Sequence, residues 1–175
     1  MAIPTLAITG PGGVGKTTVA LEVSRQLEAS GVGHALIDMD ELDRLFPPPP
    51  GDPCKSGLTT RNLAAMWTNF REAGASRLVL VAVMRSPERE LPYINAAIPA
   101  ADILVVRLRV AGETLSERVW RREVGSGGEA QIRRSLDQSC EWEREPVNGQ
   151  LIVETSGRSI TEIAAEILQR SGWPV

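Results

Sequence analysis

The sequence has few of the residues that mark a disulfide-bonded, metal-binding or membrane-spanning protein. Only two of its 175 residues are cysteine, Cys54 and Cys140. Two cysteines are too few for a disulfide framework, and neither lies at the spacing of a metal-ligating motif. The longest uninterrupted apolar run, residues 78–84, is far too short to span a bilayer. We therefore expect free thiols, a cytoplasmic location and no membrane partner.

The sequence also has no excess of positive charge. The net charge is −3, which predicts no extended basic face and so no nucleic-acid partner. The length and the 42% share of hydrophobic residues suit one globular domain over residues 1–175 with a sizeable buried core. We expect a monomer or a homodimer.

Apolar runs of strand length alternate with longer segments of helical period, which predicts an α/β fold with a parallel sheet covered on both faces. The expected strands are residues 3–8, 35–37, 78–84, 103–108 and 151–153, and the expected helices are residues 17–29, 58–73, 113–123, 130–143 and 160–168. A proline-rich stretch, residues 47–57, lies within a predicted substrate-side loop of about residues 41–60. That stretch is either close to a substrate or a stiff spacer.

One segment carries a specific chemical signal. Gly10-Pro11-Gly12-Gly13-Val14-Gly15-Lys16-Thr17 satisfies G-x-x-x-x-G-K-[ST] and lies between a predicted strand and a predicted helix. Its glycines let successive backbone N–H groups converge on phosphate oxygens at a helix N-terminus. Lys16 is expected to reach the β- and γ-phosphates and to be catalytic, and Thr17 to ligate Mg²⁺. The predicted nucleotide-binding residues here are Gly10, Gly12, Gly13, Val14, Gly15, Lys16, Thr17 and Thr18.

Two acids follow the second predicted strand. Asp38 and Asp40 lie two positions apart, and a strand period of two would place both on one face of the sheet edge. Phosphoryl transfer to an alcohol needs a metal clamp and a carboxylate that accepts the hydroxyl proton. We predict Asp38 in the Mg²⁺ shell with Thr17 and Asp40 as the base, both beside the acceptor. The alternative is that one of them only caps a short helix beginning near Glu41.

Arginines cluster further along the chain. Arg118, Arg121 and Arg122 share a predicted helix that leads into the glycine-rich residues 125–128, which predicts a lid of about residues 118–130. Such arginines can close over ATP and neutralise charge that develops on the transferring phosphoryl group. Arg118 could instead stack on adenine. The alternative is a solvated helix held by ion pairs.

The third predicted strand leads into Arg85, where many switch and motor NTPases carry an acidic Mg²⁺ ligand, and no Asn-Lys-x-Asp sequence is present. Both observations argue against a motor or a GTPase. Arg61, Arg85 and Arg89 are candidates for holding an anionic part of an acceptor. His34 opens the second strand without a partner by spacing, so we expect it to have a structural role.

With these features in this order, the chain resembles the small P-loop kinases that phosphorylate metabolites. That group includes adenylylsulfate, gluconate, shikimate and nucleoside-monophosphate kinases and the chloramphenicol phosphotransferases. Residues 37–40, 61–64 and 86–90 resemble adenylylsulfate kinase, and residues 135–146 resemble gluconate kinase. The resemblance covers nearly the whole chain. It implies a three-layer α/β/α fold with a five-stranded parallel sheet, ATP with Mg²⁺, and an adenine-contacting loop at Thr155, Gly157 and Arg158.

The leading hypothesis is therefore an ATP-dependent kinase that acts on a hydroxyl of a small molecule. The expected partner is a small-molecule acceptor. A nucleoside-monophosphate kinase is the alternative among enzymes, but a phosphate acceptor needs no base and would leave Asp40 without a task. A nucleotide-dependent switch or chaperone is the alternative of another class.

Overall fold

The chain forms a sheet between two pairs of helices. The computed structural model describes residues 1–84, 87–111, 114–115, 133, 135–137 and 149–173. In chain order the elements are β1 (Ile3–Thr9), α1 (Lys16–Ala29), β2 (His34–Asp38), the 3₁₀ turn η1 (Met39–Glu41), α2 (Ser56–Glu72), β3 (Arg77–Val81), α3 (Pro87–Ala97), β4 (Ala101–Arg109), β5 (Leu151–Glu154) and α6 (Ile160–Ser171).

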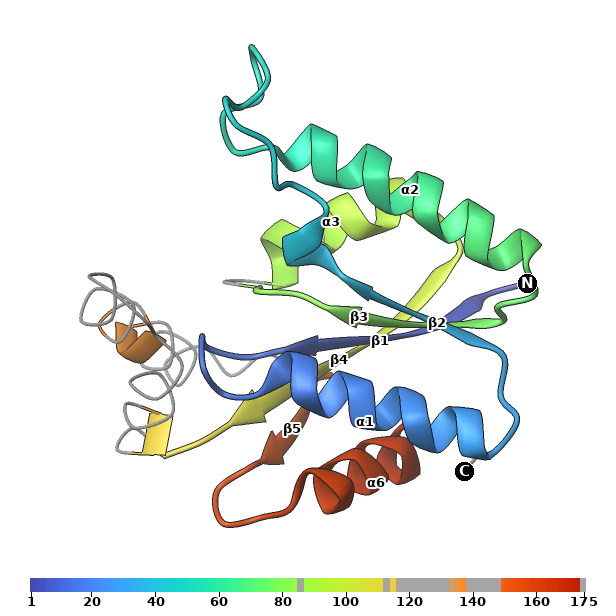
Figure 1. Cartoon of the computed structure of the whole chain (residues 1–175), viewed down its shortest axis with the longest axis vertical. Coiled ribbons are helices and arrows are strands. Elements are labelled where there is room, and N and C mark those ends of the chain that lie inside the picture. The colour runs from blue at the N-terminus through green and yellow to red at the C-terminus, as the bar shows by residue number, and fades with distance from the viewer. Residues whose placement is uncertain (85–86, 112–113, 116–132, 134, 138–148, 174–175) are drawn as a thin grey trace.

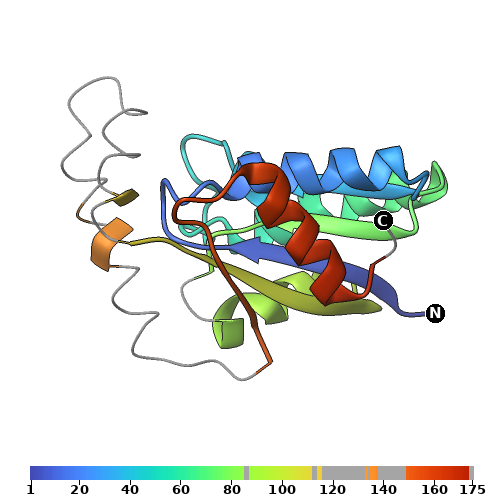
Figure 2. The ribbon, with the colours of Figure 1, turned by 90° about the horizontal axis from the view of Figure 1, so that it is seen from below.

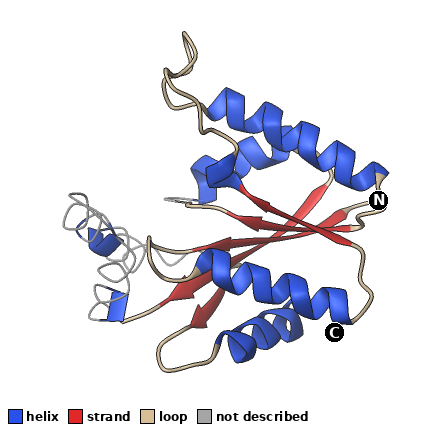
Figure 3. Cartoon of the chain, in the orientation of Figure 1, coloured by secondary structure: helices blue, strands red, loops and turns tan. Residues whose placement is uncertain are grey.

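The five strands form one parallel sheet in the order β2-β3-β1-β4-β5. Figures 1 and 3 show α2 and α3 over one face of this sheet and α1 and α6 over the other. Because both faces are covered, the central strands are apolar on both sides. In β1, for example, Leu6 and Ile8 are buried on the α1 and α6 side, and Ala7 is buried on the α2 and α3 side. The predicted three-layer fold and five-stranded parallel sheet are confirmed.

Parallel strands bring their carboxyl ends to one edge, and ligands of such sheets bind there. The loop between β1 and α1 lies at this edge, and the amino terminus lies at the opposite end of the sheet (Figures 1 and 2). A second loop, between η1 and α2, contains the predicted proline-rich stretch and projects away from the sheet (Figure 1).

The third strand is shorter than the predicted 78–84 because the chain leaves the sheet after Val81. Ala82 and Met84 are still buried in the core, which explains why the apolar run continues past the strand. Helix α3 was not among the predicted helices, and Pro92 inside it interrupts the helical pattern. Of the predicted helices at 113–123 and 130–143, the described residues 114–115, 133 and 135–137 are helical.

Among the described residues, no helix combines the length and the apolar character needed to cross a bilayer.

Candidate functional site

The loop between β1 and α1 has the backbone conformation that a phosphate cradle requires. Gly10, Gly13 and Gly15 have φ values of 154°, 83° and 105°, which residues other than glycine rarely adopt. A Cβ on Gly10 would lie 2.7 Å from Cγ1 of Val14 and 3.0 Å from the carbonyl oxygen of Leu108. Close packing therefore adds to backbone conformation in requiring glycine at position 10, whereas a Cβ on Gly15 would meet nothing within 4 Å. Helix α1 begins directly after Gly15, so its N-terminal N–H groups and dipole face the site of an anion.

Lys16 is the first residue of α1, and its side chain turns back to this loop. Its side chain is buried, and its Nζ donates to the carbonyl oxygens of Gly10 at 3.0 Å and Pro11 at 3.3 Å. The ammonium group therefore lies against the backbone of the loop, on the side from which the lysine of this motif would meet nucleotide phosphates.

Thr17 and Asp38 connect the loop of residues 10–17, here called the P-loop, with β2. The Thr17 hydroxyl donates to Oδ2 of Asp38 at 3.1 Å, although 21 positions separate the two residues. β2 is an edge strand and β3 separates it from β1. Helix α1 packs against β2 and β3 as well as β1, so Thr17 at its start can reach Asp38 at the end of β2. Thr17 and Asp38 therefore lie close enough together to contribute oxygen ligands to one metal ion.

Asp38 also caps η1. Its Oδ1 accepts from the backbone N–H of Asp40 at 3.1 Å, which satisfies a donor at the start of a helical turn. The Asp38 carboxylate thus caps η1 and also contacts Thr17. The sequence analysis treated capping and a role in the site as alternatives, but one carboxylate can serve both. The strand-alternation argument for Asp40 is wrong, however, since β2 ends at Asp38 and Asp40 belongs to the 3₁₀ turn.

Asp40 has a different electrostatic environment. Its side chain keeps an exposed surface, yet desolvation by surrounding protein raises the pKa of its carboxyl group, and the negative charge of Asp38 raises it further. Lys16 lowers the same pKa, and Asp43 and Glu41 add smaller upward contributions. A carboxylate with a raised pKa is a better proton acceptor than an ordinary aspartate.

The donor set at this position suits Mg²⁺. A hydroxyl and a carboxylate oxygen are the ligand types that Mg²⁺ takes from proteins, the other positions being filled by phosphate oxygens and water. In the part of the chain that is described, no group of three or more histidine, cysteine or acidic residues could form an all-protein metal site. Thr17 and Asp38 would therefore hold the ion together with a nucleotide.

The predicted adenine-contacting loop follows β5. Thr155 is buried, and its hydroxyl donates to the carbonyl oxygen of Arg109 at 3.0 Å, which fixes the start of the loop to β4. Gly157 has a φ of 67°. Arg158 donates to the carbonyl oxygen of Glu154 at 3.0 Å and pairs with the Glu166 carboxylate. Its guanidinium thus fastens the loop to α6, and a contact with a nucleotide base stays a prediction.

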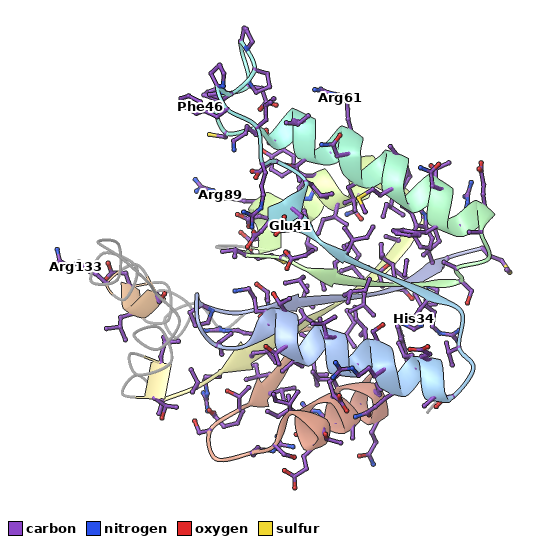
Figure 4. All side chains as sticks on the ribbon, viewed as in Figure 1. His34, Glu41, Phe46, Arg61, Arg89 and Arg133 are labelled. Carbon is purple, nitrogen blue, oxygen red and sulfur yellow. The ribbon has the colours of Figure 1, made fainter. Side chains whose placement is uncertain are left out.

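Two of the predicted acceptor-side arginines, Arg61 and Arg89, lie among the described residues. Arg61 and Arg89 are both exposed; Figure 4 shows Arg61 on the outer side of α2, away from the sheet, and Arg89 at the start of α3. Their contact with an acceptor stays a prediction. The remaining predicted arginines lie outside the described residues: Arg85, Arg118, Arg121 and Arg122.

His34 has the structural role expected of it. Its ring nitrogens lie 2.7 Å from the Ser24 hydroxyl and 2.8 Å from the carbonyl oxygen of Val32, far from the P-loop end of the sheet (Figure 4).

The sequence analysis missed three residues that support the site. Thr9, at the end of β1, accepts from the backbone N–H of Met84 at 3.1 Å and so fixes the chain that leaves β3. Asn62 and Lys55 donate to backbone carbonyls directly after η1. Each acts through a backbone group distant in sequence, so no local pattern identifies it.

No family model and no curated protein matches the chain. Solved structures do match it over nearly its full length. The tunicamycin resistance protein of Deinococcus radiodurans has a TM-score of 0.68 at 21% identity, covering 98% of this chain and 96% of that one. A gluconokinase from Sinorhizobium meliloti has a TM-score of 0.61 at 19% identity, covering 98% and 94%.

The APS kinase CysC of Mycobacterium tuberculosis, in complex with AMPPNP and APS, has a TM-score of 0.61 at 23% identity and covers 95% of each chain. These TM-scores establish the fold, and identities of this size extend the similarity no further. The structural neighbours of this chain thus include small-molecule kinases, which confirms the resemblance drawn from the sequence at the level of fold.

Proposed function

We propose that this chain is an ATP-dependent phosphotransferase that moves the γ-phosphate of ATP to a hydroxyl group of a small molecule. The observation that carries the proposal is the contact between Thr17 and Asp38 at 3.1 Å. It joins the phosphate cradle to the turn that bears Asp40, so the groups for holding a nucleotide and for activating a hydroxyl occupy one edge of the sheet.

Each residue has a defined task in the proposed reaction. The P-loop backbone and Lys16 bind the β- and γ-phosphates and neutralise their charge. Thr17 and Asp38 would hold Mg²⁺, which supplies charge neutralisation between the phosphates. As the acceptor oxygen forms its bond to the γ-phosphorus, the bond from that phosphorus to the β–γ bridging oxygen breaks and ADP leaves. The hydroxyl proton passes to the Asp40 carboxylate.

The names of the neighbours are consistent with such an acceptor. One is a gluconokinase, and another is an APS kinase solved with AMPPNP and APS. On this basis we infer a polar, hydroxyl-bearing acceptor for the present chain, and leave its identity to experiment. ATP is the nucleotide we propose, because AMPPNP is the nucleotide bound in the APS kinase complex.

A panel of acceptors separates this proposal from a nucleoside-monophosphate kinase. ADP formation would be measured with sugars, nucleosides and hydroxyl-bearing antibiotics in one set and nucleoside monophosphates in the other. Stimulation by members of the first set alone is the expected result. Stimulation by monophosphates alone would replace the proposal with a phosphate acceptor. ATP-dependent capture of a partner protein, with no stimulation by either set, would favour a switch.

A further inference from the structure

We propose that helix α2 braces Asp40 through Asn62 and Lys55, and that these two residues position the base of the reaction. The inference rests on the proposed function, because it concerns the group that accepts the hydroxyl proton. It concerns residues that touch neither the phosphate cradle nor, in the structure, the carboxylate itself.

Asp40 needs support from outside its own segment. Hydrogen bonding of β2 to the sheet ends at Asp38, and η1 is a single 3₁₀ turn of three residues. A turn of this length has little stability by itself. On its N-terminal side, Asp40 is fixed by the bond from its N–H to the Asp38 carboxylate. On its C-terminal side, the chain would be free to move unless something holds residues 42 and 43.

Asn62 supplies the first attachment. Its Nδ2 donates to the carbonyl oxygen of Leu42 at 2.6 Å, across 20 positions of sequence. The Leu42 N–H in turn donates to the Met39 carbonyl and closes η1. The Leu42 side chain is buried in the same core cluster as Leu63 and Trp67 of α2. A polar and an apolar contact thus fix the same residue to the same helix.

Lys55 supplies the second attachment. Its Nζ donates to the carbonyl oxygen of Asp43 at 2.6 Å and lies 3.8 Å from the Asp43 carboxylate. Lys55 is also the only described residue other than glycine with a positive φ, at 56°. Such a conformation is unfavourable for lysine and persists only where surrounding contacts enforce it. The Asp43 contact closes the base of the projecting loop and holds its two ends together.

The two donors act on successive carbonyls, those of Leu42 and Asp43, and both belong to α2 or its cap. Asp40 is therefore held between β2 and α2. A small displacement of a general base away from the acceptor hydroxyl lowers the rate of transfer steeply. Loss of the Asn62 and Lys55 hydrogen bonds should consequently reduce phosphate transfer. It should leave intact the nucleotide site, which is built from β1 and α1.

The first test needs no acceptor. Hydrogen exchange of the full chain would be measured for Asn62→Leu and for the control Asn69→Leu, a residue exposed on the same helix. We expect the amides of residues 40–42 to exchange roughly tenfold faster in Asn62→Leu, as for the loss of one hydrogen bond. The amides of α1 and the affinity for AMPPNP should not change, and Asn69→Leu should match the wild type. Unchanged exchange at residues 40–42 would overturn the proposal that Asn62 holds this segment to α2.

The second test is a double-mutant cycle with an acceptor from the panel. Asn62→Leu should lower kcat by roughly tenfold in the wild-type background and have no further effect in an Asp40→Asn background, because it acts through Asp40. Lys55→Met should behave in the same way and serves as the second variant if Asn62→Leu fails to fold. An equal loss of kcat in both backgrounds would mean a general structural role and would overturn the inference.

The two failures are distinguishable. If no acceptor in the panel is phosphorylated by the wild type, the proposed function fails, and the positioning role fails with it. If acceptors are phosphorylated and Asn62→Leu keeps the wild-type kcat, the proposed function stands and only the positioning role is rejected.

Discussion

Asp38 and Asp40 are separated by one residue, yet their carboxylates have different surroundings. Asp38 accepts hydrogen bonds from the Thr17 hydroxyl and from the Asp40 N–H. Burial and the charge of Asp38 raise the pKa of Asp40. Two acids whose environments differ in this way are suited to different tasks in one reaction.

Substitution of each acid by asparagine tests this division. Asp40→Asn keeps the size of the side chain but cannot accept a proton, so turnover should fall by roughly 10² or more while ATP affinity stays near that of the wild type. Asp38→Asn should instead raise the Mg²⁺ concentration needed for half-maximal activity. Steady-state kinetics across a Mg²⁺ titration distinguish the two. Unchanged turnover in Asp40→Asn would favour a phosphate acceptor or a switch.

Lys16 allows a second prediction. Its buried ammonium group is held by the carbonyl oxygens of Gly10 and Pro11, and its removal takes the point charge away from the β- and γ-phosphates. Lys16→Ala should abolish transfer and leave the thermal unfolding transition close to that of the wild type. Retention of more than about a tenth of the wild-type turnover, a loss of less than ~1.4 kcal/mol in barrier terms, would refute the role.

The sequence predicted those site residues that lie close together in the chain better than those that are far apart. The P-loop residues lie together in the chain, and their motif has a known geometry, so their arrangement was predicted. The approach of Asp38 to Thr17 followed from the position of the acids after a strand. The contacts of Asn62 and Thr9 could not be predicted, because each joins a side chain to a backbone group 20 or 75 positions away, and any residue can provide such a group.

At the scale of elements, apolar patterning located all five strands. It did not give the end of β3 correctly, and it missed helix α3. The run at 78–84 does not distinguish a strand from the buried segment that follows it, because both are apolar. Helix α3 was missed because Pro92 falls within it, and an interior proline normally argues against a helix.

The connection between β5 and α6 carries a prediction about pH. The hydrogen bond from Arg170 lowers the pKa of Glu166 below its ordinary value of 4.5, desolvation opposes this, and Arg158 lowers the pKa further. Since the folded-state pKa lies below that of the unfolded chain, the contribution is complete above about pH 4.5 and disappears as the pH falls through the folded-state value.

Glu166→Gln should accordingly lower the free energy of unfolding at pH 7 by about 0.5–1 kcal/mol, a value typical of partly exposed pairs. The difference from the wild type should shrink as the pH is lowered below 4.5. Urea unfolding at several pH values measures it, with Glu28→Gln, an exposed acid on α1, as the control. A difference independent of pH would show that the charge of Glu166 is not the cause.

The predicted lid, which lies outside the described residues, provides a further test. Joint replacement of Arg118, Arg121 and Arg122 by alanine should lower turnover more than ATP affinity, since lid charges act where charge develops in the transition state. Turnover at saturating ATP and the dissociation constant of AMPPNP separate the two effects. Weaker ATP binding with unchanged turnover would restrict these arginines to contacts in the ground state.

At the scale of the whole molecule, the topology explains why residues far apart in sequence form one site. The parallel sheet brings the ends of β1, β2 and β3 to one edge, and each end contributes a different component: the P-loop, the acids and the segment held by Thr9. The two helical layers fix that edge from both sides (Figure 3). Sequence patterning was sufficient to predict the parallel sheet with helices on both faces, because alternating strands and helices admit few topologies.

Transfer of the γ-phosphate to a small molecule is the central claim, and one measurement tests it most directly. ATP labelled with ¹⁸O in its γ-phosphate would be incubated with a metabolite extract and either the wild type or Lys16→Ala, and the products compared by mass spectrometry. The account predicts a small molecule that gains one labelled phosphate with the wild type and not with Lys16→Ala. Labelled inorganic phosphate as the sole labelled product would contradict it.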